Sequence, residues 1–473
     1  MTQRTERHPL NEVVQGAEFY RGAEEGRVRC LGGTSTRWGG AMLPFQRSDL
    51  DRHTAGWDID WLISIEDLAP QFAEIERIFD LPKGRFEPEE QPPAPSDQFL
   101  LRSAKWPTFR MRNVARVLRR DIGDAGLEVW LHATATKFRL DEAGRLSEVC
   151  ALGPNGNALT VSAPYFVLAA GAIESTRLLL LMDFQHDDRI FAPDGVLGRY
   201  FFDHLSAPAA TIAPNDRDGL VSSFGLRFDT HGMRDCRIEP TRALRSELAL
   251  PGAFAHVATV SPGHNEFTAM RSVYRALQRN SGPPTREIAT LAYNIGPLVQ
   301  LAWWRFIKRR LLPPREAIFE LALVIEQLPH AENRITISPD RKDANGSPLA
   351  KIEWRIHEED LQAFRTLQHA LVAFWKVAFR SIGRLSPTAI EVWRNRMLES
   401  SGIYHPGGST RMGASPSRGV VDAELRTFRI PNLYVVSTSA FPSGGSANPS
   451  FMLMALALRT AERIAAELQR RTV

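Results

Sequence analysis

The sequence predicts an α/β protein in which a module built on an antiparallel sheet interrupts a domain of strand-turn-helix units. Three patterns carry this prediction. Residues 160–182 are typical of a strand, a turn of small residues and a helix. Residues 332–338 alternate polar and apolar side chains and lead through a turn at 340–346 toward 350–356, as in a hairpin. Residues 432–470 are typical of a buried strand, a loop of small residues and a long helix.

The first pattern places a tight turn between an apolar strand and a helix. Residues 160–169 (TVSAPYFVLA) end in a continuous apolar run, which is typical of a strand covered on both faces. Gly171 breaks the strand, and residues 174–182 (ESTRLLLLM) predict a helix. In doubly wound sheets, ligands bind at such turns, against the N-terminus of the helix.

The middle of the chain, residues 205–400, differs in pattern from the segments on either side, because short β-like runs alternate there with helices and loops. Residues 332–338 (ENRITIS) alternate cleanly, and residues 340–346 turn toward a second strand at 350–356. Residues 361–379 have the spacing of a long amphipathic helix. We therefore expect a mixed module with an antiparallel hairpin.

The third pattern has a clear helix start. Residues 432–436 (NLYVV) predict a buried strand, and residues 439–448 (SAFPSGGSAN) predict a loop. Asn448 followed by Pro449 is the combination of N-cap and first helical residue that begins many helices, so we expect a helix over 449–470. Capping alone, at about 1 kcal/mol, would explain Asn448.

Five shorter segments complete the expected organisation. Residues 67–79 predict an amphipathic helix, preceded by an extended run over 58–65. Residues 82–95 are rich in proline and glutamate, which predicts a loop. Two strands are expected at 129–140 and 146–152, joined by a hairpin turn.

The composition is that of a globular protein and excludes several classes. Among 473 residues, 43% are hydrophobic and 24% are charged, and the net charge of +4 is too small for a dedicated nucleic-acid binder. Cys30, Cys150 and Cys236 lie far apart and form no C-x-x-C pair. We therefore expect no disulfide framework, no metal site and a reducing, cytoplasmic compartment.

One segment resembles a membrane helix. Residues 289–307 (ATLAYNIGPLVQLAWWRFI) are apolar and precede the basic run Lys308-Arg309-Arg310. Pro297 interrupts this segment, Arg305 lies inside it, and its length barely reaches that of a spanning helix. We expect a buried or partner-facing helix and no transmembrane segment.

The candidate catalytic groups lie near the end of the chain. His405 opens the loop YHPGGSTRMG, and Asn448 opens the last helix. A loop histidine beside glycines is more often structural than catalytic, and neither residue is convincing alone.

Other enzyme classes lack their motifs in this chain. A serine hydrolase would carry G-x-S-x-G at a strand-to-helix turn, and a zinc enzyme would carry H-E-x-x-H or a comparable cluster. Neither motif is present. The pair Asp203-His204 and the run His186-Asp187-Asp188 are expected to be isolated loop and surface groups.

The order of these motifs resembles the glucose–methanol–choline (GMC) oxidoreductases, in particular their bacterial members. The resemblance covers nearly all of the chain from about residue 16. Its motifs are RCLGGTSTRWGG (29–40), YFVLAAGAIESTRLLLL (165–181), LGRYFFDH (197–204), the hairpin with ENRITIS and DANG (332–346), the His405 loop, GVVD (419–422) and NLYVV to SANPS (432–450).

The resemblance implies an FAD enzyme that oxidises CH–OH groups of alcohols, often sugars, by moving a hydride from carbon to the flavin. A histidine at the place of His405 takes the hydroxyl proton, and a residue at the place of Asn448 holds the substrate oxygen. The substrate is therefore expected to be a small alcohol or sugar, not a nucleic acid. Its identity, the electron acceptor and the choice between oxidase and dehydrogenase stay open.

The same resemblance implies which residues contact FAD. Arg37 stands where some relatives carry a histidine bonded covalently to the flavin, so non-covalent FAD is expected. Ser437 stands where the family often has aspartate. The expected contacts are Gly32, Gly33, Thr34, Ser35, Trp38, Gly39, Ala135, Ala170, Gly171, Ser437, Asn448 and Pro449.

The resemblance also refines the fold class. It implies a Rossmann-like FAD-binding domain, here incomplete, interleaved with an α+β substrate domain on an antiparallel sheet. The FAD-binding domain would comprise residues 1–60, 113–204 and 405–473. The substrate domain and its connecting segments would comprise residues 61–112 and 205–404.

FAD-binding members begin with a βαβ unit that carries G-x-G-x-x-G, and this chain contains no such motif. Three explanations stay open: a start placed downstream of the true one, a split or decayed gene, or a unit supplied by another chain. We expect this chain alone to bind FAD poorly. The alternative function is therefore that of a truncated or degenerate homologue, a non-catalytic remnant or subunit.

Overall fold

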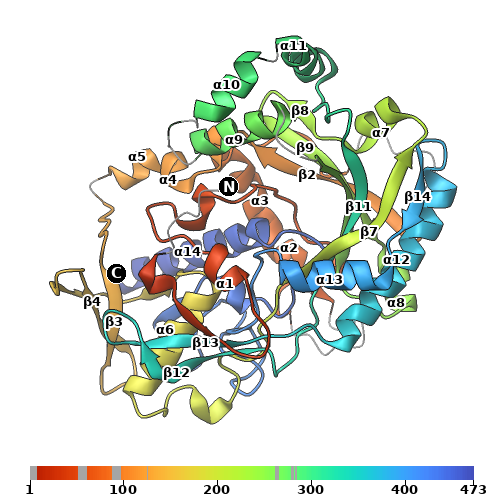
Figure 1. Cartoon of the computed structure of the whole chain (residues 1–473). Helices are drawn as coiled ribbons and strands as arrows, with labels where there is room; N and C mark the ends of the chain where they lie inside the picture. The colour runs from red at the N-terminus through yellow and green to blue at the C-terminus, as the bar shows by residue number, and fades with distance from the viewer. Residues whose placement is uncertain are drawn as a thin grey trace.

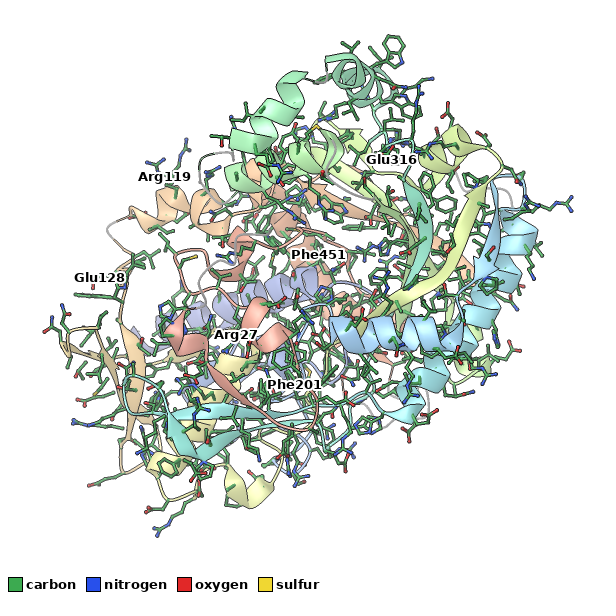
Figure 2. All side chains as sticks on the ribbon, viewed as in Figure 1. Arg27, Arg119, Glu128, Phe201, Glu316 and Phe451 are labelled. Carbon is green, nitrogen blue, oxygen red and sulfur yellow. The ribbon has the colours of Figure 1, made fainter. Side chains whose placement is uncertain are left out.

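The structure is a computed structural model that describes residues 8–51, 61–87, 97–124, 126–261, 266–278, 282, 285–293 and 295–472. Two hydrophobic clusters form its interior. Phe201 belongs to the first cluster and Phe451 to the second, and both side chains are fully buried (Figure 2).

The first cluster is organised around a seven-stranded antiparallel sheet (Figure 1). Its strands, in spatial order, are β14 (Gly383–Pro387), β7 (His204–Pro214), β11 (Ile318–Glu326), β10 (Ala253–Val260), β9 (Gly232–Pro240) and β2 (Phe99–Pro107), with β8 (Arg227–Asp229) paired to β9. This sheet confirms the expected antiparallel module in the middle of the chain.

Helix α12 (Glu358–Ala378) covers this sheet. Acidic residues in its first turn suit the positive end of the helix dipole. Phe374 stacks on Phe99 of β2 with ring centroids 4.9 Å apart, and the indole N–H of Trp375 donates to the carbonyl of Gly383 at 2.9 Å. The shorter helices around this sheet are α7 (Arg217–Phe224), α8 (Arg242–Glu247) and α13 (Ile390–Ser400).

Three small sheets and two long helices lie outside the large sheet; both helices and two of these sheets contribute to the second cluster, and the sheet that contains Val13 contributes to the first. The helices are α6 (Ala172–Gln185) and α14 (Ser450–Thr472), which confirms both expected helices. The sheets are β1 (Val13–Gln15) with β13 (Pro348–Glu353) and β12 (Arg334–Lys342), β15 (Leu433–Val435) with β6 (Phe166–Leu168), and β3 (Thr134–Leu140) with β4 (Leu146–Leu152) and β5 (Ala158–Ser162).

Short helices complete the chain. They are α1 (Gly22–Glu25), α2 (Ile65–Leu68), α3 (Phe72–Ile78), α4 (Val114–Val117), α5 (Arg119–Ile122), α9 (Glu266–Gln278), α10 (Thr285–Tyr293) and α11 (Ile295–Trp303). The expected helix over 67–79 is broken into α2, a 3-10 turn (Ala69–Gln71) and α3, since Pro70 cannot donate a helical hydrogen bond. The predictions for 58–65 and 82–95 lie partly outside the described residues.

The single strand expected over 160–169 is wrong. The chain forms β5 and β6 in two different sheets, with Pro164 between them. Proline has no N–H to give to a ladder, so the strand ends there. Val167 is 49% exposed, so the apolar run is not covered on both faces.

The membrane-like segment forms α10, α11 and a π-helical turn (Trp304–Lys308) that project at the top of the view in Figure 1. Trp304 is buried, but Trp303, Phe306 and Ile307 are exposed, so a buried helix is the wrong expectation for this end of the segment. Across the described part of the chain, each helix is too short or too polar to cross a membrane. The division into two domains by residue range stays a prediction.

Candidate active site

The structure brings the two predicted catalytic residues together. The side-chain amide of Asn448 donates to Nε2 of His405 at 3.0 Å, across 43 positions of sequence. Asn448 lies two residues before the start of α14, and His405 lies in the loop after α13. Both side chains are partly buried.

Each residue of this pair also carries a buried polar atom that is not satisfied. Among the described residues, neither Nδ1 of His405 nor Oδ1 of Asn448 has a hydrogen-bond partner. Buried polar atoms are nearly always paired in folded proteins, so unpaired ones point to a missing ligand or water. The pair is therefore suited to hold a small polar group.

Asp203 anchors the main chain at His405. Its carboxylate accepts the backbone N–H of His405 at 2.8 Å and that of His204 at 2.6 Å, and the hydroxyl of Tyr20 donates to it at 2.5 Å. A side chain at Gly402 would place its Cβ 2.5 Å from the same carboxylate. Asp203 and His204 are fully buried, so the expectation that they are surface groups is wrong.

Burial raises the pKa of Asp203 to about 6, although its hydrogen bonds from Tyr20, His405 and His204 favour the ionised form. The carboxyl thus prefers its proton more in the folded chain than in water. It is largely ionised at pH 7, where it accepts every donor described above.

His204 holds the loop of small residues that leads to Asn448. Its Nε2 donates to the carbonyl of Gly445 at 2.9 Å, and its ring meets that of His405 edge to face, with centroids 5.1 Å apart. Burial lowers the pKa of His204 to about 4, so the ring stays neutral at physiological pH. The loop that leads to Asn448 is therefore held by a group that does not titrate there.

His405 itself is also kept neutral. Burial, followed by the influence of His204 and Arg237, holds its pKa well below the ordinary value of 6.5. A neutral imidazole that accepts a hydrogen bond at Nε2 carries its lone pair on that atom. Nε2 is therefore the nitrogen of this ring that is free of a proton.

Two buried acids hold the loop of small residues before α14. Glu326, at the end of β11, accepts the backbone N–H of Gly445 at 2.5 Å. Asp49 accepts the hydroxyl of Ser446 at 2.6 Å and pairs with Arg245 at 2.6 Å. The two acids therefore hold adjacent residues of this loop.

One face of the large sheet presents polar groups near this pair. Asp235, Arg237 and Glu239 alternate along β9, so they share one face. Arg237 and Glu239 are buried, and His256 on β10 is partly buried. Four of their atoms have no hydrogen-bond partner within the described chain: Nε and Nη1 of Arg237, Oε1 of Glu239 and Nδ1 of His256.

Arg237 connects this face to the pair of His405 and Asn448. Its guanidinium lies 4.1 Å from the ring centroid of Phe254, and its Nε lies 3.6 Å from the carboxylate of Asp235. Its charge also lowers the pKa of His405 and of His204, which places it within electrostatic reach of both rings. The sequence analysis did not identify this face. The signal that could have identified it is the presence of charged residues at alternate positions of one strand.

The turn that is expected to contact the cofactor, at Ala170 and Gly171, is exposed. Strands β6 and β15 run parallel, so Ala170 and Ser437 follow them at the same edge. Gly171 has a φ of +80°, and a Cβ there would meet nothing within 4 Å. The N-terminus of α6 is therefore accessible to a ligand at this edge.

The glycine loop at 29–40 is already engaged within the protein. A Cβ at Gly32 would lie 2.8 Å from Oδ1 of Asn113, so packing explains that glycine. The hydroxyl of Ser35 donates to the carbonyl of Gly32 and accepts from the N–H of Val114. The indole of Trp38 donates to the carbonyl of Arg112. Contacts between this loop and FAD stay a prediction.

Buried charges tether this loop to the cofactor turn. Glu174, in the first turn of α6, pairs with Arg177 at 2.8 Å and with Arg29 at 3.0 Å. Burial opposes ionisation of Glu174, but these arginines and Arg27 hold its pKa below the ordinary value. Since Arg29 precedes Gly32 by three residues, the pair brings the loop close to α6.

The remaining predicted cofactor contacts are dispersed. Ala135 pairs with Ala151 in the sheet of β3 and β4, and the carbonyl of Pro449 accepts the N–H of Leu453. Thr34 and Gly39 are exposed, and Gly33 is partly exposed. Their roles stay predictions.

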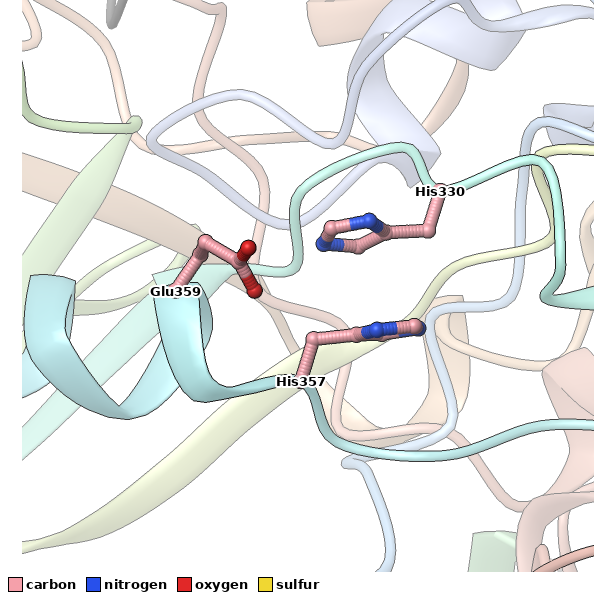
Figure 3. A group of neighbouring side chains, drawn as sticks. All are labelled: His330, His357 and Glu359. Carbon is pink, nitrogen blue, oxygen red and sulfur yellow. The ribbon is translucent and has the colours of Figure 1, made fainter.

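A separate group, His330, His357 and Glu359, lies at the start of α12 (Figure 3). Its potential ligand atoms are within 4.8 Å of one another. The two rings stack with centroids 3.6 Å apart and planes 18° apart. In-plane lone pairs of stacked rings run side by side and do not converge on one ion, so this arrangement is not a formed metal centre.

Comparisons with known proteins show which family this chain resembles. Residues 329–457 match the GMC oxidoreductase family model for the C-terminal region. The chain is 24% identical over 307 residues to 2-methyl-1,2-propanediol dehydrogenase of Mycolicibacterium austroafricanum, which covers 64% of this chain and 48% of that protein. It is 24% identical over 478 residues to 6'''-hydroxyparomomycin C oxidase of Streptomyces lividus, covering 93% of this chain and 79% of the relative. The match thus spans about half of the first relative.

Solved structures show the same fold. A formate oxidase of Aspergillus oryzae RIB40, described for its FAD modification, matches with a TM-score of 0.52 and 14% identity over 96% of this chain and 88% of its own. Pyridoxine 4-oxidase of Mesorbium loti matches with a TM-score of 0.52 and 16% identity over 92% of this chain and 84% of its own. The predicted fold class, a Rossmann-like domain interleaved with an α+β domain, is confirmed.

We expect the substitution Asp203→Asn to remove a pH dependence of stability. The folded pKa of about 6 exceeds the ordinary 3.8, so the stabilising contribution of this carboxyl is complete below about pH 4 and is lost as the pH rises through 6. The difference in unfolding free energy, wild type minus variant, should fall by about 3 kcal/mol across this range.

Urea denaturation at intervals between pH 4 and pH 7 measures that difference. Asp187→Asn, at a side chain that is 80% exposed, is the matched control. A difference between wild type and Asp203→Asn that stays constant with pH would contradict the assignment.

Proposed function

We propose that this chain, which matches the GMC oxidoreductase family over residues 329–457, oxidises CH–OH groups of alcohols or sugars with FAD and with His405 as the base. The observation that carries the proposal is the hydrogen bond between Nε2 of His405 and the amide of Asn448, at 3.0 Å, beside buried polar atoms that have no partner within the described chain.

The residues present fit a flavin nucleotide. The open turn at Ala170 and Gly171 lies at the N-terminus of α6, where a phosphate or another anionic group is favoured. The N-terminus of α14 follows Asn448, and its dipole favours negative charge near the catalytic pair. FAD, when bound, supplies the acceptor for the hydride.

His405 and Asn448 would act on the substrate hydroxyl together. A hydride leaves carbon readily only as the hydroxyl loses its proton, so a base must contact that hydroxyl. Nε2 of His405 would take the proton, and the amide N–H of Asn448 would donate to the oxygen. General base catalysis of this kind is worth about 10²–10⁴ in rate.

Asp203 and His204 are positioning residues in this proposal. Asp203 holds the backbone of His405, and His204 holds the loop before Asn448. Within the described chain, Asp203 makes no hydrogen bond to Asn448 and His204 makes none to His405. Each of them therefore fixes one half of the site. Because both hydrogen bonds go to the main chain, the two catalytic side chains keep their own hydrogen-bonding capacity for substrate.

The polar face of β9 and β10 supports a substrate with more than one hydroxyl. Arg237 offers unpaired donors and Glu239 offers an unpaired acceptor within the described chain. A hydroxyl both donates and accepts, so a polyol satisfies the two kinds of group at once. Two relatives are named for a diol and a sugar, 2-methyl-1,2-propanediol dehydrogenase and the fructose dehydrogenase large subunit of Gluconobacter japonicus.

We expect the substitution His405→Ala to lower the rate of flavin reduction by polyols about 10²–10⁴-fold, because the hydroxyl proton loses its acceptor. Anaerobic stopped-flow absorbance, with 1,2-propanediol, glycerol, fructose and glucose as the substrate panel, measures the rate. His369→Ala, on an exposed part of α12, is the control and should keep the wild-type rate. Flavin content must be equal in all samples, and an unchanged rate in His405→Ala would remove this residue from the chemistry.

Arg237→Met should raise KM for polyols about tenfold or more, since a hydrogen bond from a charged group to the substrate is lost. The value of kcat/KM for 1-propanol, which has a single hydroxyl, should change much less. Steady-state kinetics with both substrate classes provide the comparison. Arg384→Met, at an exposed arginine on β14, is the matched control. Equal losses for 1-propanol and polyols would exclude a role of Arg237 in substrate recognition.

FAD should be bound without a covalent link, since Arg37 stands in place of a histidine that could be attached to the flavin. Precipitation with trichloroacetic acid should release the yellow cofactor into the supernatant, where its absorbance is measured. A pellet that keeps the flavin after washing would refute non-covalent binding. Absence of flavin from the purified chain would instead support the alternative of a non-catalytic homologue.

A further inference from the structure

An exposed apolar surface lies at the end of α11 and in the π-helical turn after it. The side chains of Val299, Trp303, Phe306 and Ile307 are 65%, 56%, 71% and 60% exposed, respectively. The side chains around α11 stand clear of the large sheet at the top of the view in Figure 2. Soluble proteins rarely leave so many large apolar groups together in water without a partner.

This surface is also basic. Lys308 and Arg309 follow Ile307 directly, and both are exposed. No acidic residue occurs between Glu287 and Glu316 in the sequence. We call the six exposed residues Val299, Trp303, Phe306, Ile307, Lys308 and Arg309 the apolar–basic surface.

The rest of the protein holds this surface in place. The guanidinium of Arg305 lies 3.7 Å from the ring centroid of Phe228, and that of Arg310 donates to the carbonyl of Ser222 at 2.6 Å. The backbone N–H of Leu311 donates to the carbonyl of Leu226 at 3.2 Å. The turn is therefore fixed to the region of β8, and its exposed side chains are presented outward.

We propose that the apolar–basic surface seats the protein on a lipid bilayer that contains anionic headgroups. Aromatic and aliphatic side chains enter the boundary between headgroups and acyl chains, and tryptophan favours that boundary. Lysine and arginine beside them are attracted to anionic lipid. Charge complementarity selects this occupant, because a run of cations without any acidic residue matches a uniformly negative surface.

The helices fit attachment to one leaflet. Within the described residues, each helix is too short or too polar to span a membrane, so the contact would be interfacial. The proposal does not depend on the proposed oxidation, because none of the six residues belongs to the catalytic pair or to the cofactor turn.

Co-sedimentation of the full chain with lipid vesicles tests the proposal. Vesicles of phosphatidylcholine with about one-third phosphatidylglycerol should bind the protein, and vesicles of pure phosphatidylcholine should bind it at least about fivefold more weakly. Binding to the anionic vesicles should weaken as NaCl is added, because salt screens exposed charges.

Variants separate the apolar and the basic contributions. The double substitution Trp303→Ser with Phe306→Ser should abolish binding to both kinds of vesicle. Lys308→Glu with Arg309→Glu should abolish only the preference for anionic lipid. Phe184→Ser, at an exposed phenylalanine on α6, is the matched control and should bind as the wild type does. These positions are exposed, so thermal unfolding should be unchanged in every variant.

Two results would overturn the proposal. One is equal sedimentation of wild type and of Trp303→Ser with Phe306→Ser. The other is a dimer in lipid-free size-exclusion chromatography that becomes a monomer in the same variant, since the surface would then join two copies of this chain. Quenching of the emission of Trp303 by brominated lipid, measured against Trp303→Phe, gives an independent signal for insertion.

Discussion

The structure around His405 and Asn448 depends on one buried carboxylate, that of Asp203. Asp203 receives hydrogen bonds from two distant parts of the chain, Tyr20 near the start and His405 in the loop after α13, and from its neighbour His204 at the start of β7. A carboxylate without such donors would be too costly to bury. Its burial is tolerable only when all three donors are in place, so folding of the early chain and geometry at His405 are coupled.

The loop before α14 follows the same rule. Glu326 and Asp49 are buried acids, and each is bonded to this loop and lies beside the buried Arg245. Burial, with Asp49 as a nearby like charge, raises the pKa of Glu326 against the influence of Arg245. The two acids thus hold the N–H of Gly445 and the hydroxyl of Ser446, while the neutral His204, paired with Glu326 across the sheet, binds the carbonyl of Gly445. A polar site of this kind is rigid, because each buried charged group would lose its hydrogen bonds if the loop moved away from it.

Sequence patterns predicted most of the regular elements and the meeting of His405 with Asn448, but not what supports them. The helix at 450–472 has a strong start signal in Asn448 and Pro449, the helix at 172–185 follows a glycine that ends a strand, and the pair His405 and Asn448 was predicted from the order of motifs. Asp203 and His204 were misplaced, because a polar pair between two elements has no local sign of burial. Arg237 and its neighbours were missed because their importance arises from the position of β9 in the sheet. The exposure of Trp303 could not be predicted, since apolar spacing does not reveal whether a partner covers the helix.

The anchoring of His405 has a consequence for how its ring behaves. Asp203 grips only the peptide nitrogen, and Asn448 is the neighbour to which the imidazole is hydrogen-bonded within the described chain. The main-chain anchor of His405 therefore involves no atom of its ring. A change in the protonation of the imidazole leaves that anchor intact, so the backbone and the ring are held by separate contacts.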